Sequence, residues 1–109
     1  MRMLMRVSIP VEAGNAAASG GTLGTTIQKI LADLKPEAAY FAANEDGQRS
    51  GFVVFDMKDS SELPGIAEPW FLAFNAKLQV APAMNAQDLA NGLHGLERAV
   101  KSYGKAAGA

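Results

Sequence analysis

The residues most able to do chemistry in this chain are one histidine, one strand arginine and a set of scattered carboxylates. The spacing of the C-terminal helix pattern turns His94 away from its leucine stripe, so we expect His94 to be exposed. With a single His and no Cys, no Ser-His-Asp arrangement can be argued, and zinc would need Asp and Glu ligands from elsewhere. We therefore expect no metal and no other cofactor, and we assign no catalytic residue.

Aromatic residues could line an apolar pocket between a helix and a sheet. They are Tyr40, Phe55, Trp70, Phe71 and Phe74. Ligand sites are mostly apolar with a few polar groups, but an aromatic stripe at helical spacing is also typical of a plain core. Pro69, directly before Trp70, could hold the helix off the sheet and leave a void.

Two charged residues complete this candidate site. Arg6 lies in the middle of a predicted central strand, where it could anchor an anionic ligand. Alternatively, it could form an ion pair with Asp56 on the neighbouring strand or with a partner chain. Glu68, beside the Pro69-Trp70 pair, is the first carboxylate to test. The predicted ligand-binding residues are thus Arg6, Tyr40, Phe55, Glu68, Trp70 and Phe74.

The composition indicates one globular domain, which we place at residues 1–104, followed by a flexible tail over 105–109. Of the 109 residues, 49% are hydrophobic and 19% charged, which is enough to build a core. A net charge of -1 argues against general nucleic-acid binding. No stretch reaches the roughly 18 apolar residues of a membrane span. The absence of Cys fits a reducing cytoplasm.

Hydrophobic periodicity and breaker residues predict the order β-α-β-β-α-β-α. The predicted elements are a strand over 2–9, a loop with a fragment of helix over 11–21, a helix over 22–35, a hairpin over 37–57, a helix over 62–76, a strand over 77–84 and a helix over 86–103. The first six elements are those of the α+β, ferredoxin-like βαββαβ motif, with antiparallel sheet order 4-1-3-2 and both helices on one face. Pro82 fits an edge strand.

The hairpin is apolar on both faces. A two-residue turn at Asp46-Gly47 would place Phe41 opposite Phe52, Tyr40 opposite Val53, and Ala38 opposite Phe55. Because alternate residues point to opposite sides, one helix layer covers only one of these faces. We therefore predict a homodimer that pairs through the second sheet face.

Three details concern the helices. Ser60 or Ser61 is expected to cap the helix over 62–76, and Pro69 to kink or split it. Asn85, with Asp88 three residues later, is expected to cap the C-terminal helix. That helix carries an apolar stripe of Leu89, Leu93, Leu96, Val100 and Tyr103, beside the small residues Gly92, Gly95 and Ala99. The small residues indicate either close approach of another backbone or a marginally stable helix.

Two segments resemble uncharacterised bacterial members of the dimeric α/β-barrel (ferredoxin-like) superfamily. They are the opening strand with Ile9-Pro-Val-Glu-Ala-Gly-Asn15, and Ile66-Ala-Glu-Pro-Trp-Phe-Leu-Ala-Phe-Asn-Ala76 with the strand over 77–84. The resemblance extends over residues 2 to 90 and implies a face-to-face dimer. It also implies a range of activities, because the superfamily includes cofactor-independent monooxygenases, haem-degrading enzymes, chlorite dismutase-like and muconolactone isomerase-like enzymes, and stress-response barrels. Its haem-using branches rely on a well-placed His, whereas this chain has only His94.

Three functions remain open at this point. The first is a protein that binds a small apolar or aromatic ligand beside Trp70. The second is a cofactor-independent monooxygenase- or isomerase-like enzyme for a small aromatic or enolic substrate. In that enzyme Arg6 would orient the substrate and Glu68 or Asp56 would move a proton. The third is an interaction module whose dimer is its function. Binding or interaction is preferred, because no catalytic constellation can be identified.

Overall fold

Four antiparallel strands form the sheet that organises the chain: β1 (Arg2–Ile9), β2 (Ala38–Ala43), β3 (Arg49–Asp56) and β4 (Lys77–Pro82). The computed structural model describes residues 1–104, and the tail predicted over 105–109 lies outside the described residues. The strand order is β2-β3-β1-β4, which confirms the predicted order 4-1-3-2. Pro82 lies at the end of the edge strand β4, opposite Met3 of β1, as expected for a residue without a backbone N–H.

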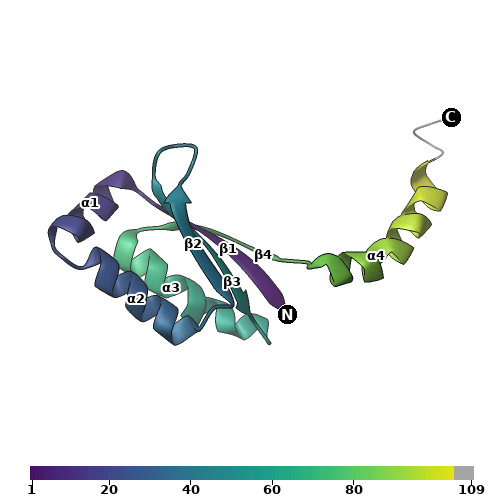
Figure 1. Ribbon diagram of the computed structural model, residues 1–109, viewed down its shortest axis with the longest axis horizontal. Coiled ribbons are helices and arrows are strands. Elements are labelled where there is room, and N and C mark those ends of the chain that lie inside the picture. Colours follow the sequence, from purple (N-terminus) through teal and green to yellow (C-terminus); the bar gives the residue numbers. More distant parts are fainter. Residues whose placement is uncertain (105–109) are drawn as a thin grey trace.

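The helices that cover the sheet lie on one side of it (Figure 1). They are α1 (Val11–Ser19), α2 (Leu23–Leu34), the short 3-10 helix η1 (Ser60–Glu62) and α3 (Leu63–Phe74). Beyond β4 follow α4 (Ala86–Ala99) and the π-helical turn η2 (Val100–Gly104). The architecture is therefore α+β and ferredoxin-like with an extra C-terminal helix. No helix in the described part is long and apolar enough to span a membrane.

Local sequence explains the buried face of α2 and its C-terminal end. Its buried stripe includes Ile30, with Ile27 and Leu34 packed against the core. Lys35 adopts the left-handed conformation at φ 52°, and its N–H donates to the carbonyl of Leu31. Pro36 cannot continue a helix, so the chain turns there into β2.

Two predicted details of the helices are wrong, and of the kink or split predicted at Pro69 the split does not occur. Residues 11–21 are mostly α-helix rather than loop, since alanines fill the interior and Pro10 precedes the first turn. The cap before α3 is Asp59 rather than Ser60 or Ser61, and Glu62 completes a capping box there. Pro69 does not split α3, which runs from Leu63 to Phe74. The cap at Asn85 is confirmed, because Asn85 and Asp88 form a second capping box.

The hairpin register differs from the prediction by one residue. The observed partners are Tyr40 with Phe52, Phe41 with Gly51, and Ala38 with Val54. The loop has three residues rather than two, because the Asn44 side chain accepts hydrogen bonds from the backbone N–H of Asp46 and Gln48. Gly47 closes this loop at φ 73°, which is the left-handed position of a three-residue hairpin.

This register decides which face each aromatic residue occupies. Val53 and Phe55 are buried under the helices, and Phe41 lies on the same side of the sheet. Tyr40 and Phe52 lie on the opposite side, which no element of the described chain covers; we call this side the open face. The hairpin is therefore apolar on both faces, as predicted. Tyr40 and Phe41, however, each lie on the face opposite to the predicted one.

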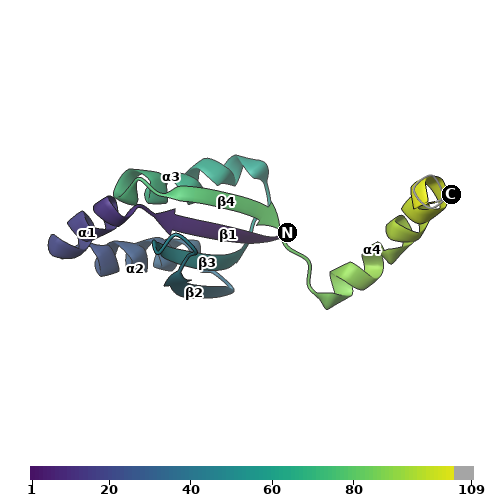
Figure 2. The same ribbon diagram turned by 90° about the horizontal axis from the view of Figure 1, so that it is seen from above.

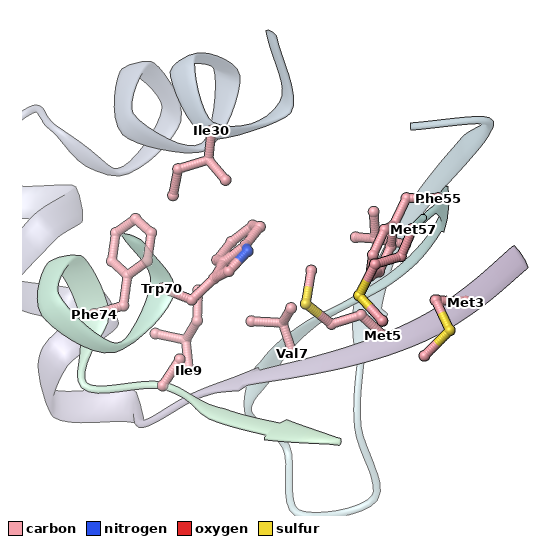
Figure 3. Packing of buried hydrophobic residues seen from close by; sticks show 11 residues of the cluster. Met3, Met5, Val7, Ile9, Ile30, Phe55, Met57, Trp70 and Phe74 are labelled. Carbon is pink, nitrogen blue, oxygen red and sulfur yellow. The ribbon is translucent and has the colours of Figure 1, made fainter. Parts of the chain in front are cut away.

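The core beneath the helices has two chemically different ends (Figure 3). At one end Met3, Met5 and Met57 gather near Phe55. At the other end Trp70 and Phe74 of α3 lie below Ile30 of α2, with the two aromatic ring centroids 6.2 Å apart and tilted by 42°. Flexible thioethers thus surround Phe55 at one end, and the rigid rings of Trp70 and Phe74 pack together at the other.

Residues 86–104, which we call the arm, project away from the sheet and its helices in both views (Figures 1 and 2). No residue of α4 or η2 is buried. The radius of gyration of the chain is 18.2 Å, with extents of 60 × 30 × 22 Å. A compact chain of this length would have a radius of gyration of about 13 Å. The described chain is therefore a small domain with an extended helical arm.

Candidate ligand-binding site

A cavity of about 200 Å³ lies on the helix side of the sheet, and we call it the Trp70 cavity. Its walls come from β1, α2, the β2–β3 hairpin and α3. The lining residues are Val7, Ile9, Ile27, Phe41, Arg49, Ser50, Gly51 and Trp70. Most of these side chains are apolar, and Val7, Ile9 and Trp70 are buried. A concave apolar site with few polar groups is the usual form of a small-molecule site.

The mouth of the Trp70 cavity is formed by its two exposed residues, Phe41 and Arg49. Phe41 can lie along the sheet because its cross-strand partner is Gly51. A Cβ at Gly51 would approach Cε1 of the Phe41 ring to 2.9 Å, which is too close without movement of the ring. The glycine therefore sets the position of the aromatic residue at the mouth.

Arg49 is held in place by α1. Its Nη1 donates to Oδ1 of Asn15 at 3.0 Å. The guanidinium passes over Gly14, where a Cβ would lie only 2.6 Å from Nη1. The small residue at position 14 thus leaves room for the arginine, and the first helix fixes a cation at the mouth of an apolar cavity.

The indole N–H of Trp70 is the unusual polar group of this site. Trp70 is completely buried, and its Nε1 has no hydrogen-bond partner among the described residues. In Figure 3 the nitrogen lies on the side of the ring toward Val7, another lining residue. A buried donor without a partner costs about 1–3 kcal/mol. The hydroxyl of Ser50, by contrast, is satisfied, since it donates to the carbonyl of Ala42 at 2.7 Å.

The structure does not bring the predicted site residues together in one pocket. Trp70 lines the cavity, and Phe55 and Phe74 are buried core residues on the same side of the sheet. Tyr40 lies on the open face with 71% of its surface exposed. Glu68 is exposed on α3 and does not line the cavity. The pocket predicted to join Tyr40 with Phe55 and Trp70 is therefore wrong, because the hairpin register places Tyr40 on the other face.

Arg6 also lies on the open face, where its guanidinium carbon is 5.2 Å from the centre of the Phe52 ring. The alternative ion pair with Asp56 is wrong, because the strand register places Arg6 opposite Phe52 and Asp56 opposite Arg2. Asp56 instead accepts a hydrogen bond from the amino group of Met1 at 2.8 Å. The hydrogen bond and the charge of that ammonium hold the pKa of Asp56 below its usual value. Arg6 is thus a stacked surface cation across the sheet from the Trp70 cavity.

Arg49 is not among the predicted site residues, although the sequence contains a signal for it. Arg49 is two residues before Gly51 and four before Val53, so it points to the same side of β3 as the buried residues. A charged residue on the buried face of a strand is rare, unless it lies at the edge of the core or takes part in a binding site. The pattern was hard to recognise, because Phe52 and Val54 make the other side of β3 apolar as well.

Three other hollows differ in character from the Trp70 cavity. One on the open face is lined by polar and charged residues that include Arg6, Lys77 and Gln79. Another lies at the base of α4 beside Arg2 and Asp88, and a third lies between α2 and α3. Over residues 1–104, no three His, Asp or Glu side chains gather as metal ligands would. The Trp70 cavity is the site that combines buried apolar walls with a positioned cation.

Comparison with known proteins identifies the fold. No family model matches the chain, and no curated protein matches it by sequence. Among solved structures, the chain is similar to 5-chloro-2-hydroxyhydroquinone dehydrochlorinase from Burkholderia phenoliruptrix, determined in complex with 2,5-dihydroxybenzoquinone. The TM-score is 0.61 at 12% identity, and the match covers 80% of this chain and 97% of that one.

A second similar structure is a protein from Deinococcus radiodurans that is thought to be an antibiotic biosynthesis monooxygenase. Its TM-score is 0.42 at 10% identity, over 79% of this chain and 95% of that one. At such low identities, structural similarity speaks to fold and leaves activity to the residues of the site. The likeness to the dehydrochlorinase thus agrees with the ferredoxin-like fold established above.

Proposed function

We propose that this chain binds a small planar aromatic or quinone-like molecule with an acidic oxygen in the Trp70 cavity. The observation that carries this proposal is the pairing of Arg49, fixed by Asn15, with an apolar cavity that Trp70 walls. A guanidinium pairs with an oxyanion, while the apolar walls take the ring. The unpartnered indole N–H of Trp70 supplies a second donor for a ligand oxygen.

The size of the cavity limits the ligand class. An engineered cavity of about 150 Å³ is known to hold benzene, whereas drug-sized ligands occupy about 300–1,000 Å³. About 200 Å³ therefore suits a single six-membered ring with small substituents. The dehydrochlorinase was determined with a ligand of this class, 2,5-dihydroxybenzoquinone. That correspondence is one of fold alone, and it suggests a probe rather than a substrate.

The geometry favours binding over catalysis. The enzyme alternative needs a group that moves a proton, and neither Glu68 nor Asp56 lines the Trp70 cavity. Arg49 is the only charged residue among the lining residues, and a guanidinium acts as a hydrogen-bond donor with no acceptor for a substrate proton. The cofactor-independent monooxygenase or isomerase remains a prediction, and the lining of the Trp70 cavity supplies no acid–base residue for it.

We further propose that the protein is a homodimer paired through the open faces, in the bacterial cytoplasm. Tyr40, with 71% of its surface exposed, and the half-buried Phe52 give the open face aromatic surface that one chain does not cover. Burial of such surface against a second copy is favourable by about 25 cal/mol per Å². The absence of Cys supports a reducing compartment.

Titration with 2,5-dihydroxybenzoquinone tests the site, because the only Trp of the chain lines it. We expect saturable quenching of Trp70 fluorescence, with a matching heat signal in calorimetry. Arg49→Met should weaken the affinity by about tenfold, the effect of losing roughly 1.4 kcal/mol of charge-assisted hydrogen bonding.

The matched control is Lys29→Met, which removes an exposed cation on α2 outside the cavity lining. Its affinity should equal that of the wild-type protein. If both variants bind the quinone equally well, the ligand does not use Arg49 and the proposed site is wrong.

A further inference from the structure

The arm carries an apolar stripe that its own chain leaves uncovered. The stripe consists of Leu89, Leu93, Leu96, Val100 and Tyr103, whose exposed fractions run from 45% to 75%. These residues fall within a narrow sector of the helix at 100° per residue, and Gly92 and Ala99 flank them. An amphipathic helix of this kind normally buries its stripe against another element.

The sequence of α4 gives the helix little stability of its own. Isolated helices shorter than about 12–15 residues are marginal in water, and α4 has 14 residues. Gly92 and Gly95 each lower its stability by about 1 kcal/mol relative to Ala. The capping box of Asn85 and Asp88 supports only the first turn. The helix therefore needs a partner surface.

The segment that joins β4 to α4, which we call the root of the arm, directs the arm away from its own sheet. The N–H of Ala83 donates to the carbonyl of Arg2 at 3.0 Å, which extends the pairing of β4 with β1 up to the arm. Arg2 Nη1 also lies 3.9 Å from Oδ2 of Asp88 in the first turn of α4. From this root, α4 leaves the end of the sheet and rises on the side opposite α2 and α3 (Figure 1).

We propose that the arm packs on a second copy of this chain, and that the two copies exchange arms. The inference rests on the homodimer proposed above, because a copy placed on the open face would occupy the side toward which α4 rises. Such an interface is self-complementary: each copy offers one arm and one receiving surface. The apolar stripe of each arm would then be buried by the other copy.

The arms supply much of the area that a stable dimer needs. A large apolar side chain presents on the order of 100 Å² when fully exposed, as transfer energies of 1.5–3 kcal/mol at about 25 cal/mol per Å² imply. Five half-exposed residues on each arm, with equal areas on the receiving surfaces, give roughly 1,000 Å² for two arms. A standard interface of about 1,600 Å² would then need roughly 600 Å² more from the open faces.

The dimer dissociation constant tests the exchange, measured by analytical ultracentrifugation on the full chain. The arm variant is Leu93→Asp with Leu96→Asp, and it should weaken the dimer by at least about 100-fold, as the loss of two buried anchors does. The control is Asn91→Asp with His94→Asp, which places two Asp on the opposite side of α4 and should leave the constant unchanged. Circular dichroism and thermal unfolding of each full-length variant establish that both variants fold.

The outcomes separate this inference from the proposed dimer. If the wild-type protein is monomeric at about 10 μM, above the micromolar upper limit of Kd for interfaces of this size, both ideas are wrong. If it is dimeric and the arm variant dimerises equally well, arm exchange is wrong and the open-face dimer stands. If Tyr40→Asp leaves the dimer intact while the arm variant breaks it, the arms hold the dimer and the open face does not.

A cross-link identifies the receiving surface directly. The photoreactive amino acid p-benzoylphenylalanine is placed at position 99, at the border of the stripe, in a mixture of ¹⁴N- and ¹⁵N-labelled chains. Arm exchange predicts cross-links between position 99 of one isotope and residues 1–82 of the other. Cross-links confined to one isotope, or none at all, would overturn the exchange.

Discussion

At the scale of single residues, Trp70 combines two functions that are normally separate. It is the largest fully buried side chain of the core, and it is also a wall of the cavity. Trp70→Ala would remove about 3–5 kcal/mol of stability through loss of packing, so it cannot isolate a role in binding. A substitution that keeps an aromatic ring is the informative one.

Trp70→Phe removes the unpartnered indole N–H and keeps most of the packing. Loss of ring volume costs stability, while removal of an unsatisfied donor returns about 1–3 kcal/mol, so the net change should stay within about 1 kcal/mol. Affinity for 2,5-dihydroxybenzoquinone should nevertheless fall several-fold, because a ligand oxygen loses its donor. Urea denaturation followed by circular dichroism and calorimetric titration measure the two effects. Unchanged affinity would show that the indole N–H does not contact the ligand.

Gly51→Ala should affect binding more than stability. The added Cβ meets the Phe41 ring at 2.9 Å, and that ring can move because it is half exposed at the mouth. We expect a change in unfolding free energy below about 1 kcal/mol and a several-fold loss of quinone affinity as the ring shifts. Gly65→Ala in α3 is the control, since a Cβ there meets nothing within 4 Å. It should raise stability by up to about 1 kcal/mol and leave binding unchanged.

At the scale of elements, the capping box before α3 makes part of the stability depend on pH. The backbone N–H of Ser61 donates to Oδ1 of Asp59 at 2.8 Å, and this hydrogen bond lowers the pKa of Asp59. A carboxyl whose pKa is lower in the folded state stabilises the protein above its unfolded pKa. That contribution is lost as the pH falls from about 4 through the lower folded value.

Thermal unfolding of the wild-type protein and of Asp59→Asn therefore has a defined pH dependence. Asn keeps an oxygen acceptor for the cap but does not titrate, so the stability advantage of wild type should shrink below about pH 4. An advantage that is constant from neutral pH to pH 3 would exclude Asp59 as its source.

Most elements were predictable from sequence because their signals are local. Pro36 and the stripe around Ile30 define α2, and the pair Asn85 and Asp88 marks the start of α4. The hairpin register was not predictable from the Asp46-Gly47 pair alone. It depends on the Asn44 side chain, which stabilises a loop one residue longer than the turn rule assumes. That single residue decided the faces of Tyr40 and Phe41, and with them most of the candidate site.

At the scale of the whole molecule, the arm couples its own helical structure to assembly. If the arms are exchanged, the amides of α4 are protected from hydrogen exchange only in the dimer, because the free helix is marginal. Dilution below the dimer dissociation constant should then raise exchange in residues 86–99 by at least about tenfold, while β1 and β3 stay protected. Exchange measured by mass spectrometry at two protein concentrations checks this. Equal exchange at both concentrations would contradict the coupling.

The placement of the arm lay beyond the reach of the sequence for a physical reason. The stripe of Leu89, Leu93 and Leu96 indicates that the helix packs against another surface, but it does not indicate which surface that is. Only the geometry at Ala83 and Arg2, which sends α4 beyond the end of the sheet, shows that the chain does not cover its own open face.

The division of the core into a methionine end and an aromatic end has a consequence for how this protein can evolve. Unbranched thioethers adapt to new neighbours, and swaps such as Met5→Leu or Met57→Leu conserve volume and cost less than about 1.5 kcal/mol. The end that holds Met3, Met5 and Met57 therefore tolerates volume-conserving changes at small cost. The end with Trp70 and Phe74 includes a wall of the cavity, Trp70, and allows few changes. Lineages of this chain should diverge first at the methionine end, and a new ligand preference should require change among the rigid rings.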